Sequence, residues 1–164
     1  MTDNEYMGIA INEAKKCLKS KDVPVGAVIV KDNHIISKAY NRKEKCRNAL
    51  AHSEIIAIAK ASKKLKSYRL DDCVIYITKE PCLMCMGAIL SARISKIVFG
   101  AFDPRFGTKD LANNNNFNHK CEIVGGICEK ECKELLSSFF KDLRGKDASS
   151  RETKYQTNSK GKRK

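Results

Sequence analysis

A chain of 164 residues, of which 42% are hydrophobic and 31% charged, has the composition of a soluble globular protein and enough length to bury one core. Its formal net charge of +13 favours a polyanionic partner, nucleic acid first, although solubility together with a basic tail would also explain it. The longest apolar run, 23–30, is too short to span a bilayer, and the first ten residues lack the pattern of a signal peptide. We therefore expect a cytoplasmic protein with no membrane contact.

Helical and strand patterns alternate along the chain. Apolar residues recur at helical spacing from Met7 to Leu18, and two β-branched runs on either side of the Asp-Asn pair at 32–33 predict a hairpin. In chain order, we expect a helix (3–19), two hairpin strands (25–31 and 34–40), a helix (53–65), a strand (73–78), a helix (82–93), two strands (96–101 and 121–126) and a last helix (128–143).

This order predicts an α/β fold in which helices cover both faces of a five-stranded mixed sheet, a three-layer α/β/α sandwich. We place the folded domain at residues 1–145. The segment 146–164 is basic and poor in apolar residues, so we expect a disordered tail that can bind phosphates without base preference. The asparagine run at 113–116 we expect in a solvated loop.

The most informative stretch is EPCLMCMGAIL at residues 80–90. Pro81 fits the start of a helix, and Cys82 and Cys85 then lie on one face of its first turn. The free N–H groups of a helix N-terminus favour thiolate over thiol, and thiolate is the form that binds zinc. Because thiols stay reduced in the cytosol, eight cysteines indicate metal binding, catalysis or core packing rather than disulfides.

A zinc site needs further ligands. A structural site would use four protein ligands, but the sequence has no second Cys-x2-Cys, and its other cysteines are better explained as small buried hydrophobes or surface thiols. His52 is the better third ligand, because it starts another predicted helix and is followed by Glu54. Alone, Glu54 would be explained as a charge that suits a helix start; beside the other three residues it favours catalysis. Three protein ligands leave one zinc position open for water.

The spacing His-x-Glu, about thirty residues, then Pro-Cys-x2-Cys is the signature of the zinc nucleobase deaminases. The chain resembles the cytidine and nucleobase deaminase superfamily and, within it, the bacterial tRNA-specific adenosine deaminases. The resemblance extends from about Tyr6 to Leu143 and rests on the stretches VPVGAVIV, AHSEIIAI, YRLDDCVIYITKEPCLMCMGAILSARISKIVFGAFDPRFG, FNHKCEIVGGI and CKELLSSFF. It implies a cytidine deaminase-like fold, a five-stranded mixed sheet between helices, with the two ligand-bearing helices side by side.

The resemblance implies hydrolytic deamination of adenosine to inosine at the wobble position of a tRNA anticodon, with tRNA-Arg as the expected substrate. One Zn2+ per subunit, held by His52, Cys82 and Cys85, would provide the hydroxide that attacks C6. Glu54 would be the proton shuttle, which takes the proton of the water, delivers it to N1 and helps ammonia to leave. A homodimer is also implied, with the anticodon stem-loop touching both subunits.

Further residues match the family's substrate contacts, but these matches are less specific than the zinc signature. Asn41 would hold the target nucleoside, the backbone N–H of Ser53 would face the reacting base, and Asp103 would contact the neighbouring sugar. On position alone, Asn41 is a polar residue closing a hairpin strand, and Asp103 starts a turn before a proline. Asn118 and Phe139–Phe140 match positions near the anticodon loop and are weaker candidates, since Phe at helical spacing is more often core.

The chain departs from the family pattern in three places: Ser53 replaces the usual alanine, the loop 108–119 is shorter and richer in asparagine, and the basic tail is additional. Two other functions stay open. A deaminase of a free base or nucleotide, such as guanine, cytosine or deoxycytidylate, would share the zinc signature. A nucleic-acid-binding module with structural zinc would need a fourth protein ligand and no Glu54. RNA accounts best for the positive charge, because a single-stranded loop presents its bases without unpairing.

Overall fold

Five strands form the central sheet: β1 (Gly26–Lys31), β2 (His34–Tyr40), β3 (Val74–Lys79), β4 (Lys96–Ala101) and β5 (Glu122–Gly125). Their spatial order is β2-β1-β3-β4-β5. β1 runs antiparallel to β2 and β3, whereas β3, β4 and β5 run parallel to one another. The predicted five-stranded mixed sheet is therefore confirmed, and every strand bound lies within one residue of the expected position.

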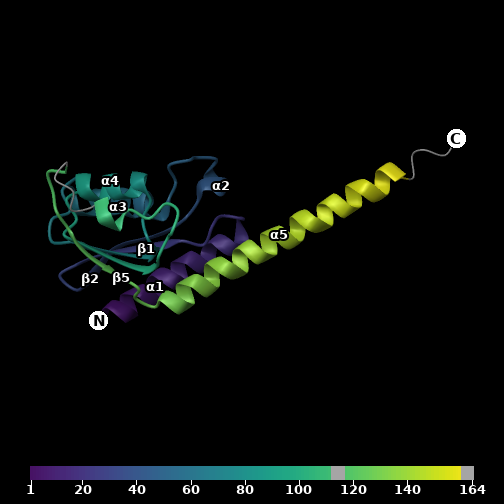
Figure 1. Ribbon diagram of the computed structural model, residues 1–164. Coiled ribbons are helices and arrows are strands. Elements are labelled where there is room, and N and C mark those ends of the chain that lie inside the picture. Colours follow the sequence, from purple (N-terminus) through teal and green to yellow (C-terminus); the bar gives the residue numbers. More distant parts are fainter. Residues whose placement is uncertain (112–116, 160–164) are drawn as a thin grey trace.

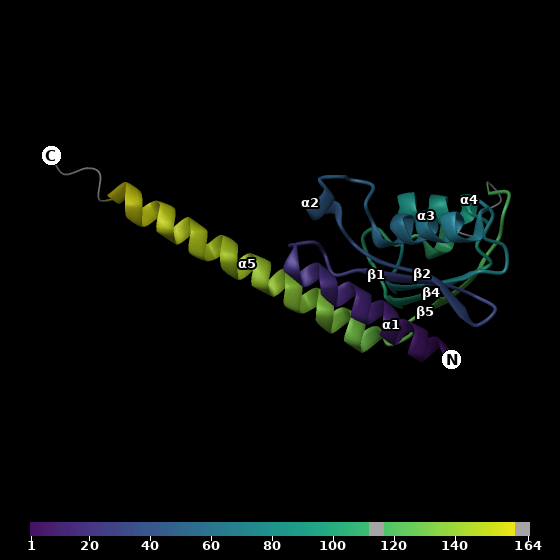
Figure 2. The same ribbon diagram turned by 180° about the vertical axis from the view of Figure 1, so that it is seen from behind.

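Helices cover both faces of this sheet (Figures 1 and 2). One face carries α1 (Asp3–Lys15), which continues as the short 3-10 helix η1 (Lys16–Lys19), and α5 (Glu129–Ser159); the other carries α3 (Ser53–Leu65) and α4 (Leu83–Ser91). This computed structural model describes residues 1–111 and 117–159, with side chains up to residue 148. The asparagine run expected in a loop at 113–116 lies outside the described residues.

Alternation along the strands builds the two cores between the layers. In β1, Ala27 and Ile29 belong to the cluster beneath α3 and α4, whereas Val28 and Val30 belong to the cluster beneath α1. Successive strand residues point to opposite faces, so a run that is apolar at every position suits a strand buried on both sides. The predicted three-layer sandwich is confirmed by this division.

The last helix is longer than the sequence predicts. α5 continues past the expected end at residue 143 as far as Ser159. Glycine in a helix interior costs only about 0.5–1 kcal/mol relative to alanine, and no proline follows Gly145 to end the helix. Figures 1 and 2 show the second half of α5 extending away from the sheet. The division into a domain at 1–145 and a tail at 146–164 stays a prediction.

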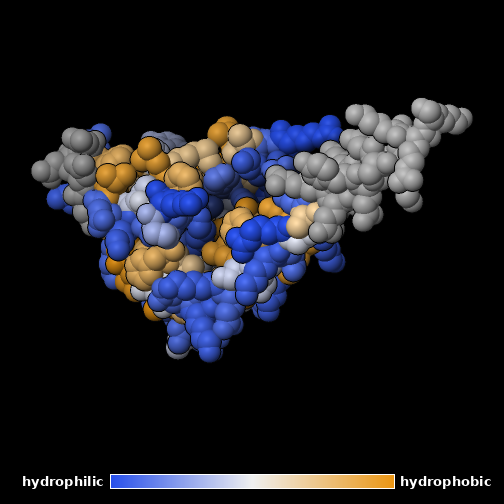
Figure 3. Space-filling view, turned by 45° about the vertical axis from the view of Figure 1, so that its right-hand side comes forward, coloured by the Kyte–Doolittle hydropathy of each residue, from blue (hydrophilic) through white to orange (hydrophobic). Residues whose placement is uncertain are grey.

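Two short helices occupy segments in which the sequence predicts loops: α2 (Lys43–Cys46) and the 3-10 helix η2 (Lys109–Leu111). α2 is held from a distant part of the chain, because the buried carboxylate of Asp22 accepts hydrogen bonds from the N–H groups of Glu44 (2.6 Å) and Lys45 (3.3 Å). Among the helices that the structure describes, none has both the length and the apolar character needed to cross a membrane. On the face seen in Figure 3, hydrophobic patches lie between hydrophilic ones.

Candidate metal and active site

His52 and Cys82 occupy equivalent places, as the N-cap residues of α3 and α4. Both have an extended backbone, with ψ of 150° and 172°, immediately before the helix starts. Neither side chain caps its own helix, so both remain available for other contacts. α3 and α4 lie next to each other on one face of the sheet (Figure 1).

The structure brings the three predicted ligands together. Nδ1 of His52 lies 3.8 Å from Sγ of Cys82 and 3.6 Å from Sγ of Cys85. Their ligand atoms lie within 4.8 Å of one another, and within the described ranges no fourth His, Cys, Asp or Glu joins this group. A tetrahedral zinc with Zn–N of about 2.0 Å and Zn–S of about 2.3 Å would separate nitrogen from sulfur by roughly 3.6 Å. The donor types and their spacing therefore fit zinc.

The protonation of the three side chains is tightly linked. Hydrogen bonds from Cys85 and then from His52 lower the pKa of Cys82 to about 3, which makes it a thiolate. The hydrogen bond to Cys82, followed by burial, raises the pKa of Cys85, and the Cys82 thiolate raises the pKa of His52. Metal ligands must be deprotonated, so a divalent cation would replace the protons that these groups share.

Glu54 lies on the first turn of α3 beside this group and is only 4% exposed. The hydroxyl of Ser53 donates a hydrogen bond to its Oε2 (2.9 Å). Burial raises the pKa of Glu54, and the hydrogen bonds from its own backbone N–H and from Ser53 only partly oppose this. A buried carboxyl with a raised pKa, next to a candidate metal site, is suited to general acid and base chemistry. Sequence reasoning assigned only the backbone of Ser53 to the site and missed this side-chain contact.

A cavity of about 190 Å³ opens beside the ligand group. This volume is below the roughly 300–1,000 Å³ that drug-sized ligands occupy, and suits one flat base. The cavity lies where β1 begins and where β2 and β3 end, so its lining comes from several segments: Val23, Val25, Asn41, Lys43, His52, Glu54, Lys79, Glu80 and Cys82.

Asn41 lines this cavity directly after β2 and is 8% exposed. Its backbone N–H donates to the carbonyl of Val25 (2.9 Å), and its own carbonyl accepts a hydrogen bond from the thiol of Cys17 (3.3 Å). The backbone is thus fixed on both sides, and the amide side chain remains available to the cavity. Its contact with a nucleoside stays a prediction.

Asp103 is turned into the protein. Its Oδ1 accepts hydrogen bonds from the N–H groups of Arg105 (2.9 Å) and Phe106 (3.1 Å), while Oδ2 forms an ion pair with Lys79. Burial raises the pKa of this carboxyl, but Lys79 and the two N–H groups outweigh burial, so the pKa is lowered overall. The structure thus displays the turn-forming role, and the contact with a neighbouring sugar stays a prediction.

None of the weaker candidates lines the cavity beside the ligand group. Asn118 lines a separate cavity of about 430 Å³, together with Arg69 and Arg93. Phe139 and Phe140 form an edge-to-face pair on α5 with ring centroids 5.3 Å apart. Sequence reasoning missed Lys79 and Glu80 as cavity residues, although both directly precede the Pro-Cys-x2-Cys motif. Their position two and three residues before the ligand Cys82 could have indicated that they line the cavity.

Comparison with known proteins identifies the family to which this chain belongs. The MafB19-like deaminase family model matches residues 1–144. The tRNA-specific adenosine deaminase of Bacillus subtilis (strain 168) is 44% identical over 156 residues, which cover 92% of this chain and 97% of the relative. A solved structure from a study of A-to-I editing by tRNA:A34 deaminases has a TM-score of 0.78 at 34% identity, covering 80% of this chain and 99% of that one.

A guanine deaminase of Bacillus subtilis is similar over a smaller part, with a TM-score of 0.60 and 39% identity, covering 62% of this chain and 66% of that one. The fuller match is thus to the tRNA deaminases, whose chains are covered almost completely. The resemblance read from the sequence is confirmed. The chain belongs to the MafB19-like deaminases and, within them, to the tRNA-specific adenosine deaminase family.

Proposed function

We propose that this protein hydrolyses the C6–amine bond of adenosine at the wobble position of a tRNA anticodon, most simply that of tRNA-Arg, to give inosine and ammonia. The observation that carries the proposal is the group of His52, Cys82 and Cys85 beside the buried Glu54, next to a cavity that suits one base. Membership of a family whose relatives are named for tRNA adenosine deamination supplies the substrate class.

The three ligands would hold one Zn2+ per subunit, through Nδ1 of His52 and the sulfurs of Cys82 and Cys85. When bound, zinc supplies a Lewis acid that lowers the pKa of water toward about 7. The donors come from the ends of two helices fixed on one sheet face, so their spacing is set by the fold. A group of three protein ligands within the described residues supports a catalytic site over a structural one, which would use four.

Glu54 would move the protons of the reaction. It would accept a proton from the attacking water, deliver it to N1 of adenine, and assist the loss of ammonia from C6. A raised pKa suits this exchange, because a group that must both accept and donate works best when its pKa approaches the working pH. Ser53 would orient Glu54 through its hydroxyl, and Asn41 would hold the nucleoside through its amide.

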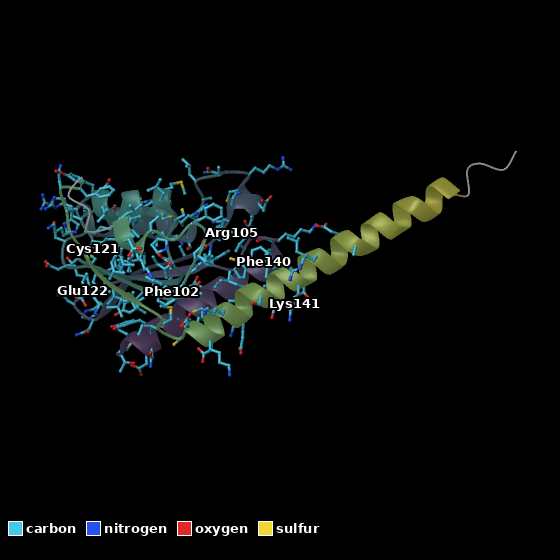
Figure 4. The ribbon with its side chains drawn as sticks, viewed as in Figure 1. Phe102, Arg105, Cys121, Glu122, Phe140 and Lys141 are labelled. Carbon is cyan, nitrogen blue, oxygen red and sulfur yellow. The ribbon has the colours of Figure 1, made fainter. Side chains whose placement is uncertain are left out.

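The surface beyond the cavity suits single-stranded RNA. A second cavity of about 570 Å³ shares Glu80 with the first and is lined from both the loop after β4 and α5. Its charged lining is mixed, with Lys109 and Lys133 beside Asp103 and Asp110. Phe106 is 65% exposed, and Lys109 Nζ lies 4.8 Å from the ring centroid of Phe102. Exposed rings can stack on unpaired bases and cations can neutralise phosphates. Figure 4 labels further aromatic and basic residues of this loop and helix: Phe102, Arg105, Phe140 and Lys141.

Four further expectations concern the location of the protein, its oligomeric state, Asp103 and the basic tail. We propose a cytoplasmic homodimer in which the anticodon stem-loop touches both subunits and Asp103 contacts the sugar next to the target. The basic segment 146–164 would add contacts to phosphates, so affinity should fall steeply as salt rises.

Inosine formation on a synthetic anticodon stem-loop with adenosine at the wobble position tests the proposal, with free adenine, guanine and cytidine assayed in parallel. We expect conversion of the stem-loop alone, and a loss of about 10²–10⁴-fold in Glu54→Ala at unchanged zinc content, because that variant removes the proton shuttle. Glu13→Gln is the matched control, since Glu13 is a buried carboxyl on α1, across the sheet from the site.

Two results would contradict this scheme. Full activity in Glu54→Ala would refute the catalytic role of that carboxyl. Ammonia released from a free base, with no inosine in the stem-loop, would assign the protein to free-base deamination, the activity that the similarity to a guanine deaminase represents.

A further inference from the structure

Glu80 is a buried carboxylate for which the proposed chemistry has no use. It is 5% exposed and lies between the end of β3 and Pro81, where its backbone N–H donates to the carbonyl of Ala101 (2.8 Å). Its side chain lines both the base-sized cavity and the adjoining cavity of about 570 Å³. A carboxylate taken out of water needs hydrogen-bond donors, and the identity of its donors indicates its role.

Both oxygens of Glu80 accept hydrogen bonds from the backbone of one loop. Oε2 accepts from the N–H of Asp103 and Oε1 from the N–H of Lys109, each at 3.0 Å. The side chain therefore ties together the two ends of the segment 103–109. The hydroxyl of Thr108 donates to the carbonyl of Pro81 (2.8 Å), so the same loop is also attached to the turn that leads into Cys82.

The contact between Glu80 and this loop leaves no space. A Cβ atom on Gly107 would lie 2.4 Å from Cδ of Glu80 and 2.5 Å from the carbonyl oxygen of Asp103. Only glycine permits this approach. The loop is thus closely packed on its inner side, whereas Phe106, next to Gly107, is 65% exposed.

We propose that Glu80 is a positioning residue, which holds the loop 102–109 against the turn that carries the ligand Cys82. This contact sets the distance between the reacting base and the loop residues that bind the nucleotides on either side of it. The inference rests on the proposed function and deepens it, because it names the loop that holds the RNA beyond the target base. Glu80 acts through the backbone of this loop, since each of its oxygens accepts a hydrogen bond from a backbone N–H of the loop.

The test compares Glu80→Gln with Glu13→Gln in the full-length, zinc-loaded protein. Glutamine keeps the shape of Glu80 but turns an NH₂ group toward one of the two backbone N–H donors. Glu13, on α1, is similarly buried, at 6% exposed, and pairs with Lys16. Hydrogen–deuterium exchange over 102–111 reports the anchoring, while zinc content, kcat and KM on the stem-loop report its consequence.

We expect faster exchange over 102–111 in Glu80→Gln, a KM raised about tenfold, a kcat reduced by less than about threefold, and unchanged zinc content. Glu13→Gln should change none of these. An unchanged KM, or a loss of zinc that accounts for the lost activity, would overturn the inference. If Glu80→Gln fails to fold, Gly107→Ala disturbs the same contact with the carboxylate intact, and its readouts decide in the same way. A wild-type protein that fails to convert the stem-loop would refute the proposed function itself, a distinct outcome.

Discussion

Gly26 begins β1 where the strand packs tightly against α1. A Cβ atom there would lie 2.0 Å from the backbone oxygen of Ala10 and 2.7 Å from the backbone nitrogen of Ala14. Both are main-chain atoms of a packed helix, so neither can swing away as the end of a flexible side chain could. Gly26→Ala must therefore push α1 away from the sheet.

Inserting a methyl group into a packed interior typically costs about 1–3 kcal/mol, and contact with two main-chain atoms places this substitution at about 3 kcal/mol. For a chain of this size, such a loss lowers the melting temperature by about 6–12 °C. The effect should reach the site as well, because Gly26 follows the cavity residue Val25 and pairs with Tyr40, the neighbour of Asn41. We expect a raised KM along with the lost stability.

Thermal unfolding of Gly26→Ala beside Gly8→Ala measures this effect. Gly8 lies within α1 and has nothing within 4 Å of an added Cβ, so the same substitution there should stabilise the protein by about 0.5–1 kcal/mol through helix propensity. A lower melting temperature in Gly26→Ala and a higher one in Gly8→Ala would show that the loss comes from packing and not from the added methyl group itself. A Gly26→Ala protein as stable as the wild type would refute the close packing of α1 on β1.

Two further predictions concern the metal group and the loop that follows β4. Cys85→Ser removes a ligand sulfur, so zinc measured by atomic absorption should fall well below about one per subunit. Cys73→Ser, at a buried cysteine outside the ligand group, should keep its zinc, and full zinc in Cys85→Ser would contradict the ligand assignment. The lowered pKa of Asp103 means that its ionised form stabilises the fold fully above about pH 4, and that this contribution is lost as the pH falls through the lowered value. Asp103→Asn should therefore melt below the wild type at pH 7, with a gap that closes as the pH falls below about 4. A gap independent of pH would contradict the role of the carboxylate.

The ligand positions could be predicted because they depend on short-range sequence. Pro81 and the residues after His52 mark helix starts, and a helix start fixes where the preceding and following side chains lie. That α3 and α4 pack side by side, which brings His52 to the cysteine pair, depends on the topology of the sheet. The sequence reached this second step only through the family resemblance.

Contacts between distant segments explain what the sequence did not reveal. Nothing local indicates that Glu80 accepts hydrogen bonds from residues more than twenty positions away, or that the carboxylate of Asp103 is occupied by Lys79. From the sequence, the hydroxyl of Ser53 could equally cap its own helix, and only the structure shows that it donates to the buried carboxylate of Glu54. The length of α5 could not be predicted for a different reason, since residues 146–159 are polar and poor in apolar residues, a composition that is typical of disorder.

Two segments beside the site, α2 and the loop 102–109, are each held in place by a buried carboxylate. Asp22, which is 1% exposed, accepts hydrogen bonds from two N–H groups of α2, as Glu80 does from the loop 102–109. A charged acceptor on backbone donors fixes the path of a loop and leaves its outward side chains unconstrained. The metal ligands cannot be varied in this way, because zinc coordination tolerates little displacement of the ligand atoms. Substitutions that change which RNA is bound, with zinc content intact, should therefore be found among the exposed residues of 43–46 and 102–109.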